Sequence, residues 1–246
     1  MSGLPLLLLP GLMCDRVVWG ETMAALPGGL TCIVPDYGDI DTLGGMAERV
    51  LALAPPRFAA AGHSMGGRVA LEIFRRAPER VAGLALLDTN YLPRPAGEAG
   101  AREERERMAL MALARRFGTR IMGETWVKGM VHPDRLGDAA LIGAILDMFQ
   151  RKTADTFSAQ IKALLARPDA TPLLGAIRCP TLVLCGREDS WAPLARHEAM
   201  AAAIAGSELV VVEKCGHMSP MERPREVAGA FTAWLARIAD RRAVAA

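Results

Sequence analysis

The stretch Gly62-His63-Ser64-Met65-Gly66-Gly67 (GHSMGG) sets one serine among three glycines, between an apolar run and an amphipathic one. The apolar run, Phe58–Ala61, is typical of a buried strand, and Met65–Ala77 has apolar residues at helical spacing. In Gly-x-Ser-x-Gly, a tight strand-to-helix turn leaves no room for side chains two residues before and after the serine. A glycine turn with an incidental serine is the alternative. The strand and helix on either side favour a nucleophile on a strained turn.

Short apolar runs alternate with helical patterns on both sides of this turn. The predicted strands are Leu4–Leu9, Thr31–Val34, Phe58–Ala61, Val81–Leu87, Thr181–Cys185 and Glu208–Val212. The predicted helices cover about Val18–Leu26, Leu43–Ala54 and Met65–Ala77, with others beginning near Pro193 and at Pro224. This alternation predicts an α/β fold with a mostly parallel sheet of about six strands and helices on both faces.

The middle of the chain, residues 91–175, has helical periodicity and no convincing strand. We interpret it as a helical insertion into a core made of residues 1–90 and 176–246. Within it, Arg102–Arg107 (REERER) alternates in charge and offers Arg102–Glu106 and Glu103–Arg107 pairs four residues apart. That pattern is typical of a solvated helix face.

Composition narrows the class of protein. The 246 residues are 51% hydrophobic with a formal net charge of +2, which suits one α/β domain and gives no electrostatic case for nucleic acid or a membrane surface. The five cysteines are scattered without a Cys-x-x-Cys pair, which argues against a disulfide framework and a structural zinc site. The apolar opening lacks a basic leader and is broken by Pro5 and Pro10. We therefore expect a cytoplasmic protein with no membrane partner.

A serine hydroxyl needs a base to become a nucleophile, and four histidines are available. His63 lies inside the turn, and we expect its ring to point away. His132 lies in the insertion, and His197 has charged neighbours in a helical pattern, which predicts a surface position. His217 follows the strand Glu208–Val212 in a short loop, so it is expected at the carboxyl edge of the sheet. His217 is the predicted base.

The acid that orients this base is predicted to be Asp189, which follows the strand Thr181–Cys185. Asp88, at the end of an earlier strand, is the rival, and a plain surface-loop role is the alternative for Asp189. Glu188 is expected to face elsewhere. The chain order Ser64, Asp189, His217 is that of a serine–acid–histidine triad on an α/β sheet. Backbone N–H groups of Leu12, after the first strand, and of Met65 are the predicted oxyanion donors.

Four motifs in this order resemble the α/β-hydrolase superfamily: the apolar strand into Pro10-Gly11-Leu12, GHSMGG, GREDSWAP (Gly186–Pro193) and CGHMSPMERP (Cys215–Pro224). The resemblance implies a helical cap over residues 91–175, Ser64 as nucleophile, Asp189 as acid, His217 as base, and no cofactor or metal. Two features depart from the family pattern. Members usually carry His-Gly where this chain has Pro10-Gly11, and usually begin with a β-hairpin before that strand.

The expected activity is a serine hydrolase acting on a small or medium carboxylic ester, thioester or lactone. Its partner would be that small-molecule substrate, with the chain a monomer or homodimer. Apolar cap residues suggest an apolar pocket, although plain core packing is the alternative; they are Met108, Leu110, Met111, Leu113, Met122, Trp126 and Met130. Trp126 and Met218 are the predicted pocket residues. Alternatives on the same scaffold are haloperoxidase-like perhydrolysis, C–C bond hydrolysis, and ligand binding without catalysis.

Overall fold

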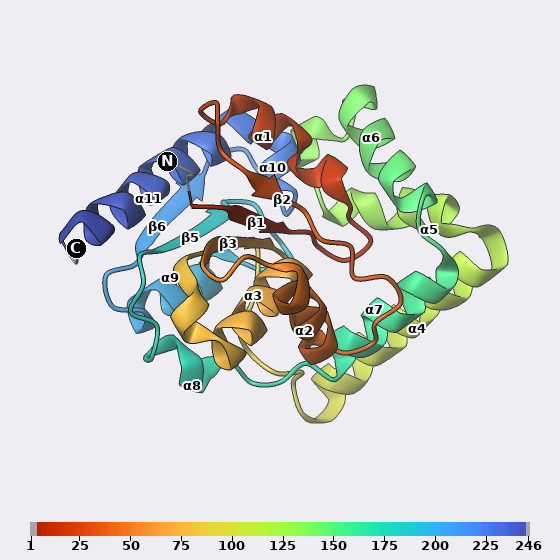
Figure 1. Ribbon diagram of the computed structural model, residues 1–246. Helices are drawn as coiled ribbons and strands as arrows, with labels where there is room; N and C mark the ends of the chain where they lie inside the picture. The colour runs from red at the N-terminus through yellow and green to blue at the C-terminus, as the bar shows by residue number, and fades with distance from the viewer. Residues whose placement is uncertain (1–3, 245–246) are drawn as a thin grey trace.

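The computed structural model describes residues 4–244, with side chains described as far as Arg241. Six parallel strands form one sheet in the order β2-β1-β3-β4-β5-β6 (Figure 1). Their bounds are β1 Leu6–Leu9, β2 Cys32–Ile33, β3 Phe58–His63, β4 Val81–Leu87, β5 Thr181–Gly186 and β6 Glu208–Val212. The predicted mostly parallel sheet of about six strands is therefore confirmed.

The central strands are buried along their whole length, because helices cover both faces of the sheet. The pairs Leu9–Gly62 and His63–Leu87 bring the ends of β1, β3 and β4 to one edge. Since all strands are parallel, the segment after each strand begins at this same carboxyl edge. Ser64 and Asp88 follow β3 and β4 there.

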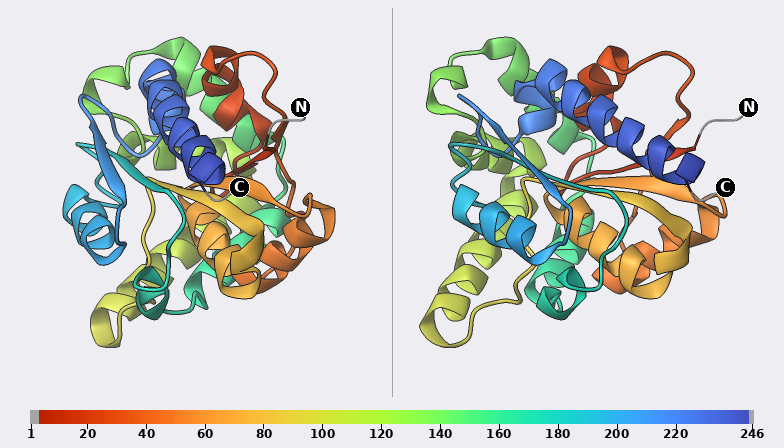
Figure 2. Two further views of the ribbon diagram at one scale, coloured as in Figure 1. Left: turned by 60° about the vertical axis from the view of Figure 1, so that its left-hand side comes forward. Right: turned by 90° about the vertical axis from the view of Figure 1, so that its left-hand side faces the viewer.

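Helices lie on both faces of the sheet (Figures 1 and 2). One face carries α1, α10 and α11, and the other carries α2, α3 and α9. The bounds are α1 Gly20–Ala25, α2 Leu43–Leu53, α3 Met65–Arg76, α9 Leu194–Ala203, α10 Ser219–Glu222 and α11 Pro224–Val244. Of two 3-10 turns in the core, η1 Arg16–Trp19 precedes α1 and η2 Pro78–Arg80 follows α3.

The segment between β4 and β5 is helical, as its periodicity predicts. It contains α4 Gly97–Phe117, α5 Thr119–Trp126, η3 Val127–Gly129, η4 Pro133–Arg135, α6 Ala139–Gln150, α7 Ala154–Leu165 and α8 Thr171–Leu174. The helices α4 to α7 lie beside the core, whereas α8 lies beneath the sheet near α9 (Figure 1). Among the described residues, no helix is both long and apolar enough to cross a lipid bilayer.

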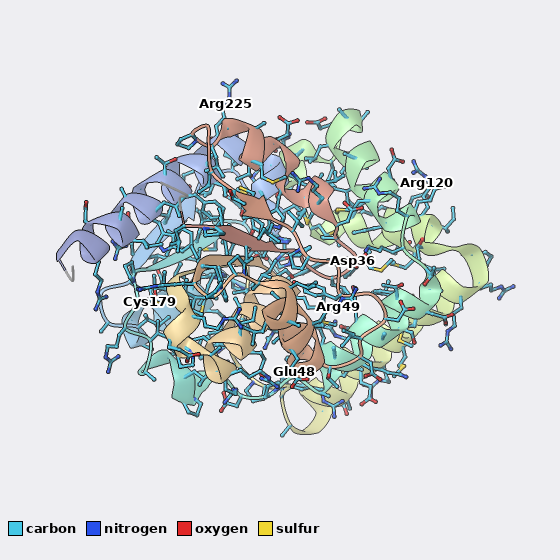
Figure 3. The ribbon with its side chains drawn as sticks, in the orientation of Figure 1. Asp36, Glu48, Arg49, Arg120, Cys179 and Arg225 are labelled. Carbon is cyan, nitrogen blue, oxygen red and sulfur yellow. The ribbon has the colours of Figure 1, made fainter. Side chains whose placement is uncertain are left out.

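Polar contacts tie the α6–α7 region to loops of the core. Lys152 Nζ lies 3.2 Å from Asp36 Oδ1, and Thr156 Oγ1 donates to Asp39 Oδ1 at 2.6 Å. Asp36 is also held from the core side, where Arg49 Nε donates to its backbone oxygen at 2.8 Å (Figure 3). The loop after β2 therefore connects helix α2 to the insertion.

Several predicted bounds differ from the observed ones. The strand predicted at Thr31–Val34 has only two paired residues, Cys32 and Ile33, because it is an edge strand with one neighbour. The strand predicted at Phe58–Ala61 continues through Gly62 and His63, which pair with β4. The helix predicted at Val18–Leu26 is a 3-10 turn followed by α1.

Candidate active site

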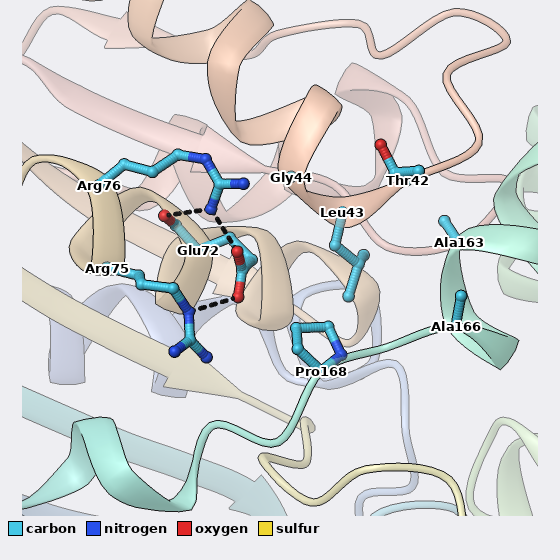
Figure 4. A pocket seen from close by; sticks show the side chains of 9 residues that line it. All are labelled: Thr42, Leu43, Gly44, Glu72, Arg75, Arg76, Ala163, Ala166 and Pro168. Atoms are coloured by element: carbon cyan, nitrogen blue, oxygen red, sulfur yellow. Dashed lines mark hydrogen bonds and ion pairs between the residues drawn. The ribbon is translucent and has the colours of Figure 1, made fainter.

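Two cavities are candidates for the functional site. The first, about 640 Å³, lies between α2, α3 and the end of α7 (Figure 4). Its one carboxylate is already paired: Glu72 accepts from Arg75 Nε at 3.0 Å and pairs with Arg76. The second, about 560 Å³, is lined by Ser64 and His217 at the carboxyl edge of the sheet. Of the two, the second combines a serine hydroxyl with an imidazole, so it is the candidate active site.

Ser64 occupies a strained turn between β3 and α3. Its backbone has φ 54° and ψ −117°, a conformation that residues other than glycine rarely adopt. Three hydrogen bonds hold it: Ser64 N donates to Leu87 O at 2.9 Å, and Ser64 O accepts from Thr89 Oγ1 at 2.6 Å and Gly67 N at 3.0 Å. The surrounding structure therefore fixes the serine at the start of α3.

The glycines of the turn are a steric requirement. A Cβ on Gly62 would overlap the backbone of Gly66, and a Cβ on Gly66 would overlap the carbonyl of Leu9. Both neighbours are backbone atoms of packed elements and cannot move aside cheaply. This agrees with the spacing argument made from the sequence.

The structure brings together the three side chains of the predicted triad. His217 Nε2 lies 2.8 Å from Ser64 Oγ, and His217 Nδ1 lies 2.8 Å from Asp189 Oδ2. The other oxygen of Asp189 accepts from the N–H groups of Trp191 and Ala192, each at 2.9 Å. The carboxylate is thus oriented by backbone donors, and the imidazole lies between acid and hydroxyl.

Asp189 and His217 each shift the pKa of the other. Burial raises the pKa of Asp189, but the charge and hydrogen bond of His217 outweigh burial and hold that pKa below its usual value. Burial likewise lowers the pKa of His217, whereas Asp189, Asp88 and Glu222 raise it, with a net rise. An imidazole whose protonated form is stabilised in this way can accept a proton from a neighbouring hydroxyl.

Asp88, the rival acid, makes its hydrogen bonds elsewhere. Its Oδ2 accepts from Ser219 Oγ at 2.5 Å and Ser219 N at 3.2 Å, and its Oδ1 accepts from Gly186 N at 3.1 Å. Burial, together with the charge of Asp189, raises its pKa well above the usual value. The carboxyl group of Asp88 therefore joins β4, β5 and the start of α10.

The expectation that His63 points away from the site is wrong. Its ring is buried beside His217, with Nε2 2.7 Å from the backbone oxygen of that residue, and it also lines the cavity. Burial and the nearby His217 lower the pKa of His63 to about 3, so the ring is neutral and Nε2–H is the donor. The loop after β6 covers the end of β3, and a sequence pattern cannot show that contact.

The surface position predicted for His197 is also wrong. The residue is fully buried, because α9 turns this face toward β5 while its charged neighbours face outward. Its Nε2 accepts from Thr89 N at 3.0 Å, and burial lowers its pKa to about 4. His132 lies outside the triad, with Nδ1 accepting from Asp134 N at 3.1 Å.

The predicted oxyanion donors, Leu12 and Met65, both line the cavity. The loop carrying Leu12 is fixed on two sides: Met13 N donates to Gln160 Oε1 at 2.8 Å, and Tyr37 Oη donates to Pro10 O at 3.3 Å. Gln160 comes from α7 of the insertion. The sequence pattern did not point to Gln160 or Tyr37, because both are remote in the chain from the residues they hold.

Glu222 is a further residue that the sequence analysis missed. Its Oε1 accepts from Gly216 N at 2.9 Å and Met218 N at 3.2 Å, on both sides of His217. Its Oε2 accepts from His132 N at 2.8 Å. Glu222 shapes the loop that presents His217 and ties it to the insertion. The sequence contains a signal for this role, because Glu222 lies four residues after Met218 in the first turn of a short helix. A glutamate near the start of a helix can accept hydrogen bonds from the backbone N–H groups there. Glu188 lies outside the Ser64–His217–Asp189 series and accepts from Cys215 N at 3.0 Å.

The cavity walls include both predicted pocket residues, Trp126 and Met218. Trp126 stacks on Trp191 with ring centroids 5.2 Å apart, and the Trp191 ring lies 5.0 Å from that of His217. Of the other apolar residues named between residues 91 and 175, Leu110 and Met130 also line the cavity, whereas Met111 and Met122 are core residues and Met108 is exposed.

The charge run on α4 is not simply a solvated face. The expected Glu103–Arg107 pair forms, with Arg107 Nε 3.0 Å from Glu103 Oε1, but both residues line the cavity. Glu103 also accepts from Arg167 at 2.6 and 2.7 Å. The prediction of a Glu103–Arg107 pair from the i,i+4 spacing is confirmed. The prediction that the pair lies on a solvated face is wrong, because α4 turns this side toward the core.

Within the part of the chain that the structure describes, no group of three or more His, Cys, Asp or Glu side chains is arranged to hold a metal ion. The charged side chains of the cavity are Arg68, Glu103, Glu106, Arg107, Arg167 and Arg196, beside Asp88 and His217. Hydrogen bonds hold the Ser64 hydroxyl, the His217 imidazole and the Asp189 carboxylate in series.

This fold and site define an α/β-hydrolase. Residues 6–230 match the family model described as the alpha/beta hydrolase family, and the chain belongs to that family. Relatives named as esterases and hydrolases place it among the hydrolytic members.

The chain is 28% identical over 245 residues to a pimeloyl-[acyl-carrier protein] methyl ester esterase of Aromatoleum aromaticum, covering 91% of this chain and 94% of that one. A solved thermophilic esterase from Thermogutta terrifontis, with malate bound, is 31% identical, with a TM-score of 0.86 over 96% of this chain and 91% of that one. An enol-lactonase from Burkholderia xenovorans shares the fold at 22% identity, with a TM-score of 0.82 over 95% and 92%.

Proposed function

We propose that this protein is a serine hydrolase that cleaves a small or medium carboxylic ester, thioester or lactone through an acyl-enzyme. The observation that carries the proposal is the pair of 2.8 Å contacts from His217 to Ser64 Oγ and to Asp189 Oδ2. A hydroxyl, an imidazole and an oriented carboxylate in series are the parts that nucleophilic acyl transfer requires.

In the proposed mechanism, His217 Nε2 takes the proton of Ser64 as Oγ attacks the acyl carbon. The N–H groups of Leu12 and Met65 stabilise the oxyanion. Asp189 stabilises the imidazolium, which then gives its proton to the leaving oxygen or sulfur. Water, deprotonated by the same histidine, attacks the acyl-enzyme and releases the acid. The residues of this chain supply every step without a cofactor.

The two esterase relatives, each covering more than nine-tenths of this chain, support ester over other acyl substrates. The stacked Trp126 and Trp191 rings support an apolar group next to the scissile bond. The helices of residues 91–175 would act as the cap that covers this substrate.

The test compares Ser64→Ala with Ser207→Ala, a serine before β6 whose hydroxyl donates to Ala201 O. Ser64→Ala should abolish hydrolysis of p-nitrophenyl butyrate and labelling by a fluorophosphonate. Ser207→Ala should retain both. Hydrolysis that persists in purified Ser64→Ala protein would contradict the proposal.

A second candidate is hydrolytic C–C bond cleavage. A relative named 2-hydroxy-6-oxononadienedioate/2-hydroxy-6-oxononatrienedioate hydrolase, from Klebsiella pneumoniae, is 31% identical over 173 residues. That match covers 65% of this chain and 56% of the relative, less than the esterase matches cover. Loss of the absorbance of a 2-hydroxy-6-oxodienoate, without turnover of simple esters, would favour this second function.

A further inference from the structure

Three arginines line the same cavity as Ser64. Arg68 comes from α3, Arg107 from α4, and Arg167 from the segment after α7. One partly buried carboxylate, Glu103, lies among them. Cations are seldom buried without partners, so the way these charges pair decides what the cavity can bind.

The Glu103 carboxylate is shared by two of the three arginines. Arg167 donates to both of its oxygens, at 2.6 and 2.7 Å, and Arg107 Nε donates to one of them at 3.0 Å. Even so, Arg167 Nε is buried without a hydrogen-bond partner among the described residues. The donors of the cluster therefore exceed its acceptors.

Arg68 has no carboxylate of its own. Its Nη1 donates to the backbone oxygen of Leu92 at 3.0 Å, and no ion pair within 4.0 Å joins it to any described side chain. Burial, with the charges of Arg167 and Arg107, lowers its pKa to about 9, so it stays a cation at neutral pH. At the rim, Glu106 and Arg196 are both exposed and cancel in charge. Even with both Glu103 and Asp88 counted as ionised, three arginines face two carboxylates, so the inner cavity is left with a net positive charge.

We propose that Arg68 binds an ionised carboxyl group of the substrate, so that the enzyme acts on esters that carry a second, free carboxylate. The inference rests on the proposed esterase function and names its substrate class. Arg68 is four residues beyond Ser64 on α3, about 6 Å along the helix, which puts both ends of such a substrate in one cavity. The planar guanidinium fork matches a carboxylate in two parallel hydrogen bonds.

The rest of the cavity suits the chain that joins the two carboxyl groups. Leu110, Ile161 and Leu164 line it together with the arginines. A short methylene chain can pack on these apolar side chains while its charged end meets Arg68. A neutral ester of the same length makes the apolar contacts and leaves the cation unpaired.

The test uses two matched pairs of esters, assayed by titration of the acid released. Monomethyl adipate against methyl heptanoate places the carboxylate on the acyl side. The pair 4-acetoxybutanoate and pentyl acetate places it on the alcohol side. In the wild type, kcat/KM should favour the charged member of at least one pair by about 10- to 100-fold, the range of a charge-assisted hydrogen bond.

Variants locate the effect. Arg68→Met should lower the ratio within the preferred pair to near 1, chiefly through KM, and Arg68→Lys should give an intermediate ratio. Arg57→Met, which removes an exposed arginine just before β3 at the opposite edge of the sheet, should keep the wild-type ratio. A preference that survives Arg68→Met in folded protein would overturn the inference.

Binding gives a readout that does not depend on turnover. Adipate should bind the Ser64→Ala protein in isothermal titration and should bind the Ser64→Ala, Arg68→Met protein at least tenfold more weakly. If the wild type cleaves neutral and charged esters equally, the esterase function stands and the carboxylate site is wrong. If no ester is cleaved and Ser64 is not labelled, the esterase function is wrong, and Arg68-dependent adipate binding alone supports the site.

Discussion

Nε2 of His63 donates a hydrogen bond to the backbone oxygen of His217 at 2.7 Å, so the residue before the proposed nucleophile holds the main chain of the proposed base. His63→Leu keeps an apolar body but leaves that buried oxygen without its donor. We expect kcat to fall about tenfold and the free energy of unfolding to fall by about 1–3 kcal/mol. The measurements are ester hydrolysis and urea unfolding.

The control for this prediction is His132→Ala. His132 lies outside the Ser64 cavity and is tied to the loop at Asp134. The His132→Ala substitution should change kcat less than twofold. Equal losses in the two variants would mean that the His63 contact has no special part in positioning His217.

The pH profile should report the titration of His217. Only the neutral imidazole can take the Ser64 proton, so kcat/KM should fall about tenfold per pH unit below the pKa of His217. Because Asp189 raises that pKa above its ordinary value, the acid limb should lie at a higher pH than an ordinary histidine would give. Asp189→Asn removes the negative charge and should shift the limb to lower pH. A limb that stays in place in this variant would mean that another group titrates.

The two buried aspartates should differ in kind. Asp189→Asn should lower kcat by about 10⁴-fold, because the amide favours the wrong tautomer of His217. Asp88→Asn should cost mainly stability, since Asp88 hydrogen-bonds Ser219 and Gly186 instead of His217. Turnover of both variants, with circular dichroism to verify folding, separates the roles. Greater loss of turnover in folded Asp88→Asn would reverse the assignment.

Two Gly→Ala substitutions should change the free energy of unfolding in opposite directions. In Gly66→Ala the new Cβ meets the carbonyl of Leu9, which should destabilise the fold by about 2–3 kcal/mol. Gly143, inside α6, has open space around its Cβ position, so Gly143→Ala should stabilise by about 0.5–1 kcal/mol. Thermal unfolding of both proteins measures the contrast. A neutral Gly66→Ala would mean that the α3–β1 approach is looser than the structure has it.

The contact between Gln160 and Met13 allows a test of the loop that carries Leu12, the proposed oxyanion donor. Gln160→Met removes the acceptor of Met13 N–H and should lower kcat by about tenfold or more with little change in KM, because the N–H of Leu12 is no longer held in place. Gln150→Met, at the exposed end of α6, is the matched control and should leave kcat unchanged. A change confined to KM in Gln160→Met would place its role in substrate binding.

The positions that could be predicted from the sequence are those set by the pattern of neighbouring residues along the chain. Ser64, Asp189 and His217 each follow an apolar run that forms a strand, and parallel strands bring such positions to one edge. The sequence predicted worst what depends on packing between distant elements. His197 is buried because α9 turns it inward, and Glu103 reaches Arg167 across 64 residues of chain. No local period encodes either contact.

Asp189 is held by the N–H groups of residues 191 and 192, whereas the side chain of Trp191 forms part of the cavity wall. The main chain and the side chain of one residue thus have separate tasks. Any residue with an N–H at position 191 could preserve the orientation of the acid while altering the space next to His217. Substitutions at this position, in evolution or in design, could therefore change substrate preference while the hydrogen bond to Asp189 is kept. Proline is the exception, because it has no N–H to donate.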